Sequence, residues 1–97
     1  MTCRISIIQE DTRYCYVCGR YGTEIHHIYF GVGNRKLSEK YHCVVGLCPY
    51  HHRGNKGVHQ NRELDLILKK TAQEAFEAHY PNIDFLAVFG RNYIFNN

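Results

Sequence analysis

Cysteine and histidine, the residue types that most often bind transition metals in proteins, occur in ordered groups in this chain. A Cys-x-x-Cys pair comes first, two adjacent histidines follow, and a Cys-x-x-His-His group comes later. In chain order the residues are Cys15, Cys18, His26, His27, Cys48, His51, His52 and His59. Thiolate and imidazole groups are the ligands that zinc prefers. The pattern therefore predicts two metal sites, one structural and one catalytic.

The structural site is predicted from two half-sites, Cys15-x-x-Cys18 and Cys48-x-x-His51. Zinc takes four tetrahedral ligands, and a spacing of two residues lets both side chains of a half-site point at one ion. Because the half-sites are far apart in the chain, the ion would join two segments of a small domain and contribute to its folding.

Two other assignments of the fourth zinc ligand replace His51 by Cys43 or His52. We rank them lower, because Cys43 lies at an odd spacing from Cys48 and would face the other side of a regular strand. Cys3 has no partner in this scheme and is expected to be a small, half-buried apolar residue.

In order and spacing, these motifs resemble the HNH, or ββα-metal, nuclease family. The shared features are Cys-x-x-Cys at 15–18, Glu-x-His-His-Ile at 24–28, a glycine-rich basic loop, and Leu-Cys-x-x-His-His at 47–52. The finer pattern is similar to phage Ref-like recombination-enhancement nucleases, which similarly show His-His, Gly-x-Gly, Leu-Cys-x-x-His-His-x-Gly and Gly-x-His. The resemblance covers residues 14–59 and, more weakly, 89–93.

The resemblance implies a role for each remaining histidine. His26 matches the family's metal ligand, and His27 matches its general base. His52 and His59 match the later histidines that complete the metal site. The expected cofactors are a structural Zn²⁺ and one catalytic divalent ion, which is Mg²⁺, Mn²⁺, Ni²⁺ or Zn²⁺. The expected activity is that of a metal-dependent DNA endonuclease, phage-encoded and linked to DNA recombination.

Phosphodiester hydrolysis needs such a set on chemical grounds. A neutral imidazole takes a proton from water, which is typically worth ~10²–10⁴ in rate. A divalent ion stabilises charge that develops on the phosphate and the leaving oxygen. Side chains alternate along a regular strand, so His26 and His27 could share one site only at a strand end or a bulge. Glu24 would share the face of His26 and orient an imidazole, or else it is an exposed strand charge.

The sequence departs from the family pattern at one position. The family's middle Asn, which helps to fix the loop that carries the base, usually lies five residues before the cysteine of the second half-site. Cys43 occupies this position here. A backbone carbonyl, His42 or Asn34 are the candidate substitutes.

Basic residues are concentrated around the metal-type motifs. Residues 35–62 hold six basic residues and one acidic residue, a local charge of +5 within a net charge of +3 for the chain. Such a region suits a phosphate-rich partner, although a solvated face is the alternative. The residues expected to contact DNA phosphates are Arg35, Lys36, Lys40, Arg53 and Lys56. Gly31 and Gly33 would let the backbone approach the DNA closely.

The secondary structure that would position these residues is read from hydrophobic patterns and turn residues. The clearest element is a helix at 62–79, whose apolar residues recur at steps of three and four and which Pro81 ends. Strands are expected at 5–8, 23–30 and 41–47, a glycine-rich loop at 31–36, a helical turn at 38–40, and short helices from residue 48 and at 83–89. The expected fold is α+β: a small zinc-stapled ββα-metal core at about 14–60 with additional C-terminal helices at about 62–90, in one domain over 1–97.

Composition limits the class of protein. A hydrophobic share of 44% with eight Tyr and five Phe is too apolar for a disordered chain. The apolar run at 5–8 is too short for a signal peptide or a membrane span. Five cysteines are an odd number, which argues against a disulfide framework. A cytoplasmic protein is expected, in the host cell if it is phage-encoded, with no membrane partner.

The expected partners are DNA and a recombinase filament. One alternative function is a non-catalytic, zinc-stapled DNA-binding module, which would leave the four histidines beyond the zinc set without a role. A second alternative is a recombinase-interacting protein, which requires neither cleavage nor salt-sensitive DNA binding.

Overall fold

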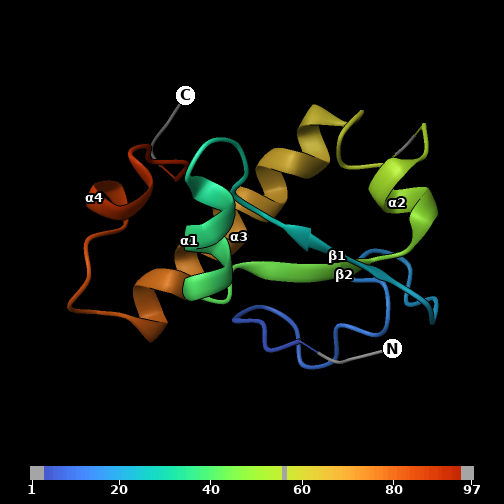
Figure 1. The fold of residues 1–97 in the computed structure, drawn as a ribbon, viewed down its shortest axis with the longest axis horizontal. Helices are drawn as coiled ribbons and strands as arrows, with labels where there is room; N and C mark the ends of the chain where they lie inside the picture. The colour runs from blue at the N-terminus through green and yellow to red at the C-terminus, as the bar shows by residue number, and fades with distance from the viewer. Residues whose placement is uncertain (1–3, 56, 95–97) are drawn as a thin grey trace.

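The structure, a computed structural model that describes residues 4–55 and 57–94, has an α+β fold. Two antiparallel strands form a small sheet, in which Glu24 lies opposite Leu47 and His27 lies opposite Val44. Figure 1 shows the sheet near the centre, with α2 beyond one end and α4 beyond the other. The elements are β1 (Glu24–His27), α1 (Asn34–Lys40), β2 (Val44–Leu47), α2 (Pro49–Arg53), α3 (Arg62–His79) and α4 (Phe85–Phe89).

Both predicted strands around the histidines are present but shorter than expected. All four residues of β2 are buried, as its run of Val and Leu favours. This strand begins only at Val44, because Tyr41 ends α1 and His42 takes a left-handed backbone with φ 61°. The strand predicted at 5–8 is wrong. Residues 4–9 contain no strand, with bends only at residues 7 and 8, and the backbone N–H of Ile7 donates to the carbonyl of His42 at 3.0 Å instead of joining a ladder.

The outer edge of β2 is covered by the N-terminal segment, which runs below the sheet in Figure 1. At Gly46 the backbone N–H donates to the Gln9 side chain and the carbonyl accepts from the N–H of Tyr16, each at 2.8 Å. A Cβ at position 46 would lie 1.9 Å from the carbonyl oxygen of Thr12, so only glycine fits. Covering this edge satisfies its backbone groups and draws the first cysteine pair toward β2.

The glycine-rich stretch after β1 is shorter than predicted, and a helix follows it directly. Gly31 and Gly33 have positive φ angles of 103° and 83°, which the turn requires. The prediction that the loop continues through the two basic residues is wrong, because α1 begins at Asn34. Ser38 fixes α1 against the end of β1: its hydroxyl donates to the carbonyl of Tyr29 and accepts from the N–H of the same residue.

The predicted long helix is confirmed as α3, with Leu68, Ala72 and Phe76 on its buried face. The short helix after it begins at Phe85, two residues later than expected, because the Asp84 side chain caps it. Aromatic rings from five segments of the chain complete the core. They are Tyr29, Tyr41, Phe76, Phe85, Phe89 and Tyr93. Among the described residues, no helix is both long and apolar enough to span a membrane.

Candidate metal centres

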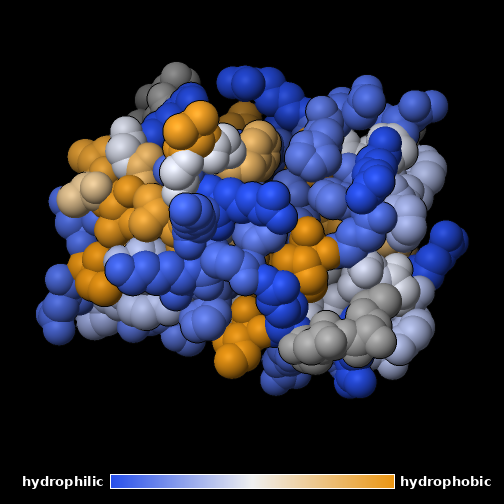
Figure 2. Space-filling view, viewed as in Figure 1, coloured by the Kyte–Doolittle hydropathy of each residue, from blue (hydrophilic) through white to orange (hydrophobic). Residues whose placement is uncertain are grey.

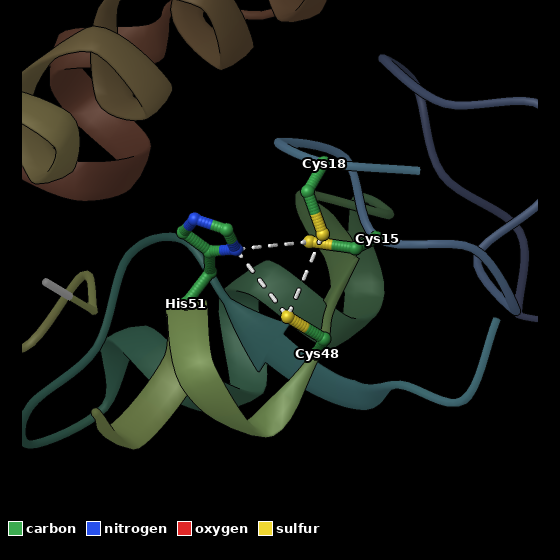
Figure 3. Close-up of side chains that lie close together, drawn as sticks. All are labelled: Cys15, Cys18, Cys48 and His51. Carbon is green, nitrogen blue, oxygen red and sulfur yellow. Dashed lines mark hydrogen bonds between the residues drawn. The ribbon is translucent and has the colours of Figure 1, made fainter. Parts of the chain in front are cut away.

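Four ligand-type side chains converge between the turn before β1 and the start of α2 (Figure 3). Cys15 and Cys18 lie in a tight turn, where the N–H of Gly19 donates to the carbonyl of Cys15 and Gly19 has φ 78°. Cys48 follows β2 and occupies the N-cap position of α2, and His51 lies in the first turn of that helix. The four ligand atoms all lie within 4.8 Å of one another. The predicted structural set is therefore assembled in space.

The distances in this cluster fit a zinc ion. Sulfur–zinc bonds of about 2.3 Å and nitrogen–zinc bonds of about 2.0 Å place two tetrahedral ligands about 3.5–3.8 Å apart. The Sγ atoms of Cys18 and Cys48 are 3.7 Å apart. The Nδ1 atom of His51 is 3.3 Å from the sulfur of Cys48 and 3.8 Å from that of Cys15. These three distances are compatible with one tetrahedral zinc ion held by the four side chains.

A bound cation would stabilise the thiolate forms of Cys15 and Cys18. Burial disfavours the Cys15 thiolate, but hydrogen bonds from backbone N–H groups, that of Cys48 first, outweigh burial and lower the pKa of Cys15 to about 6. At Cys18 the backbone N–H of Arg20 favours the thiolate, yet burial and the two neighbouring sulfurs raise its pKa. A bound cation would relieve the repulsion among these sulfurs, as structural zinc does.

A second cluster contains His26 from β1, His52 from α2 and His59 from the segment after α2. Their ligand nitrogens lie within 4.8 Å of one another, and the ring centres are 5.1–5.3 Å apart. A close turn brings the third histidine back. A Cβ at Gly57 would lie 2.9 Å from the carbonyl carbon of His52, so the chain passes that residue closely. The structure thus brings together the three histidines that the resemblance grouped.

His26 is the buried member of this cluster, with 2% of its surface exposed. Burial, followed by the positive charges that His52 and His59 would carry, lowers the pKa of His26 to about 3. The ring is therefore neutral at pH 7. Among the described residues, none hydrogen-bonds its Nε2 atom. An unsatisfied buried nitrogen costs about 1–3 kcal/mol, and a metal ion at the centre of the three rings would satisfy it.

Glu24 fixes the second histidine of the cluster. Its Oε1 atom lies 2.6 Å from Nδ1 of His52 and 2.9 Å from Nε of Arg53. The hydrogen bond to His52, followed by the charge of Arg53, lowers the pKa of Glu24, so the carboxylate is ionised. It therefore accepts a hydrogen bond from Nδ1–H of His52, which leaves the Nε2 lone pair of that ring available to a metal. This carboxylate–histidine pair is typical of catalytic and structural metal sites.

The aromatic ring of Phe30 lies beside the three-histidine cluster, a contact that the sequence did not predict. The ring of Phe30 lies 5.9 Å from that of His26 and 5.6 Å from that of His59. The Lys69 ammonium lies 4.3 Å from the Phe30 ring centre and bonds Asp65 at 2.8 Å. Phe30, His59 and Asp65 line part of a hollow of about 330 Å³. No sequence pattern links α3 to this site, because the contact arises only from packing.

His27 lies outside the three-histidine cluster. The prediction that a strand end or a bulge lets His26 and His27 share one site is wrong. The strand does end at His27, but its pairing is regular up to that residue and the side chain contacts Glu39 of α1. Its Nε2 atom lies 2.5 Å from Oε2 of Glu39, whose other oxygen bonds Arg4. The hydrogen bond from Arg4, then that from His27, lowers the pKa of Glu39. Sequence reasoning missed this carboxylate.

Two of the predicted DNA contacts lie beside His27. Arg35 and Lys36 line, with His27 and Glu39, an open hollow of about 470 Å³. The face of the molecule drawn in Figure 2 is largely hydrophilic, with hydrophobic residues gathered near α4 and in smaller patches near the centre. The other predicted contacts are dispersed. Lys40 lies over the ring of Tyr41, Arg53 is held by Glu24, and Lys56 falls outside the described residues, as does Cys3.

Of the predicted substitutes for the family's middle Asn, neither His42 nor Asn34 hydrogen-bonds the His27 side chain among the described residues. Cys43 is buried in the core, and burial raises the pKa of its thiol to about 12, so it is a protonated apolar residue. Asn34 begins α1. His42 lines a separate hollow with Arg4 and Glu39. The residue that does contact His27 is Glu39.

The whole chain was also compared with known proteins. No family model, no curated protein and no solved structure matches it. The geometry of the two clusters and their surroundings is therefore the basis for any functional conclusion.

Proposed function

We propose that this protein is a metal-dependent DNA endonuclease of the HNH type, with a structural zinc at the Cys₃His cluster. The single observation that carries the proposal is the cluster of His26, His52 and His59, in which the buried Nε2 of His26 has no hydrogen-bond partner among the described residues. In this proposal the separate cluster of Cys15, Cys18, Cys48 and His51 would hold the structural zinc, which leaves the three histidines for chemistry.

The donor set restricts the ion that this site would bind. Three neutral imidazoles suit Zn²⁺, Ni²⁺ or Mn²⁺ better than Mg²⁺, which prefers oxygen ligands. When bound, such an ion supplies positive charge to the phosphate and the leaving oxygen. His26 and His52 would hold it from two elements of the core, and Glu24 would keep His52 in the orientation that binds.

The other side of β1 supplies the groups that act on water and DNA. His27 is the candidate base that accepts a proton from the attacking water. Arg35 and Lys36, which line the same hollow, would bind phosphates next to the cut and fix its position without reading the base sequence. The scissile phosphodiester would then lie across the end of β1, between the two faces of the strand. We also propose a link to recombination and a phage origin, which rest only on the resemblance to Ref-like nucleases.

A plasmid nicking assay tests the proposal. Supercoiled plasmid should be converted to nicked circles when the zinc-loaded protein receives Mn²⁺ or Ni²⁺, and a chelator that spares the structural zinc should stop the conversion. His79→Ala, a histidine on α3 outside both clusters, is the control and should nick at the normal rate. Salt-sensitive DNA binding without nicking under any of these ions would favour the non-catalytic binding module.

A further inference from the structure

Glu39 contacts the candidate base directly, and nothing in the sequence pattern assigns it a role. The carboxylate comes from the last turn of α1 and reaches back to the end of β1. Its Oε2 atom lies 2.5 Å from Nε2 of His27. The imidazole is mostly covered, with 13% of its side chain exposed, so it has little freedom to turn away.

The chemistry of the pair fixes which nitrogen carries the proton. A neutral imidazole has one N–H donor and one acceptor nitrogen, whereas an ionised carboxylate can only accept. A bond between Nε2 of His27 and the Glu39 carboxylate therefore places the ring proton on Nε2. Nδ1 is then the nitrogen whose lone pair is free to accept a proton from water.

A second contact keeps the carboxylate in place. Arg4, from the segment before the zinc half-site, bonds the other oxygen of Glu39. A carboxylate held by a guanidinium on one oxygen keeps a preferred direction for the hydrogen bond on the other. Glu39 therefore holds the His27 imidazole from the last turn of α1, through a contact between the two side chains. Neither His42 nor Asn34 is seen to contact His27 among the described residues.

We propose that Glu39 is the positioning residue for His27, holding the imidazole as the Nε2–H tautomer so that Nδ1 is the atom that takes the proton. This inference rests on the proposed nuclease function for its catalytic consequence, but the tautomer itself can be measured without any cleavage. In this scheme water gives one proton to Nδ1 of His27 and attacks the phosphorus as hydroxide, while the other ring proton stays on Nε2, hydrogen-bonded to Glu39.

Nitrogen chemical shifts of the His27 ring, measured by NMR on the zinc-loaded protein with Mg²⁺, test the tautomer. We expect a protonated Nε2 and an unprotonated Nδ1 in the unmodified protein. Glu39→Ala should give a mixture of the two tautomers, while Glu39→Gln, whose amide oxygen can still accept from Nε2–H, should restore the first state. A ring protonated on Nδ1, or one that does not respond to Glu39→Ala, would overturn the proposal.

Nicking kinetics of the same variants separate positioning from charge. Glu39→Ala should lower kcat about 10–100-fold without raising KM, and Glu39→Gln should recover most of the rate. Both variants lose one negative charge beside Arg35 and Lys36. If charge alone mattered, both variants would therefore show the same lower KM. That result would count against the proposal. Glu74→Ala, an exposed residue of α3, is the control. Absence of nicking by the unmodified protein would reject the nuclease function, while the NMR result would still decide the tautomer.

Discussion

His26 and His27 are adjacent in β1, yet their imidazoles lie on opposite faces of the strand. His26 packs against the rings of His52 and His59, while His27 lies against Glu39 of α1. The regular pairing of β1 with β2 produces this separation, because successive side chains of a strand alternate. One short strand therefore presents a candidate metal ligand, His26, on one face and a candidate general base, His27, on the other.

The zinc cluster should be needed for folding. Cys48→Ala removes a buried ligand that joins the first cysteine pair to α2, and we expect loss of zinc and of most of the folded structure. Binding of a structural zinc contributes about 10–16 kcal/mol in small domains, which is as large as the usual net stability of about 5–15 kcal/mol. Metal content and circular dichroism measure the two losses. Cys43→Ala is the control and should keep the zinc. A folded, zinc-free Cys48→Ala protein would exclude the structural role.

Glu24 should govern metal affinity at the three-histidine cluster. Glu24→Ala removes the bond that orients His52, and we expect the affinity for Ni²⁺ to fall about 10–100-fold in calorimetric titrations of the zinc-loaded protein. Glu39→Ala, which removes a carboxylate from the other face of β1, should leave this affinity unchanged. Equal affinities for Glu24→Ala and the unmodified protein would show that Glu24 is an ordinary surface charge.

Arg35 and Lys36 should contribute to DNA affinity through phosphates alone. Changing both to Ala should weaken binding to every duplex sequence alike, and the slope of log K against log salt should fall by about 0.9 for each lost contact. A double change of Lys70 and Arg91, exposed residues that lie outside the hollow beside His27, serves as the control. If the slope is kept while sequence preference is lost, these residues read bases.

Gly46 should be required for docking of the N-terminal segment. Gly46→Ala places a methyl group against the backbone carbonyl of Thr12, which cannot move aside as a flexible side chain could. We expect the free energy of unfolding to fall by about 1–3 kcal/mol in urea titrations at constant zinc. An unchanged midpoint would mean that the segment does not lie along β2 in solution.

Parts of this arrangement were predictable, since they depend on local spacing. The two residues between Cys15 and Cys18 predict a turn that presents both sulfurs, and the periodic apolar residues of 62–79 predict α3. The contact between His27 and Glu39 was not predictable, because it depends on where α1 packs over the sheet. The strand predicted at 5–8 failed for a similar reason: the edge it would have joined is paired with Gln9 and Tyr16.

Metal titrations of nicking by His26→Ala and His27→Ala test the central claim, that one histidine holds the ion and its neighbour takes the proton. Both variants should fold, retain the structural zinc and bind DNA. His27→Ala should nick about 10²–10⁴-fold more slowly at every metal concentration, since the missing step is proton removal. His26→Ala should recover part of its rate as Mn²⁺ or Ni²⁺ is raised. Full activity of His27→Ala, or recovery of His27→Ala but not His26→Ala with added metal, would contradict this division of roles.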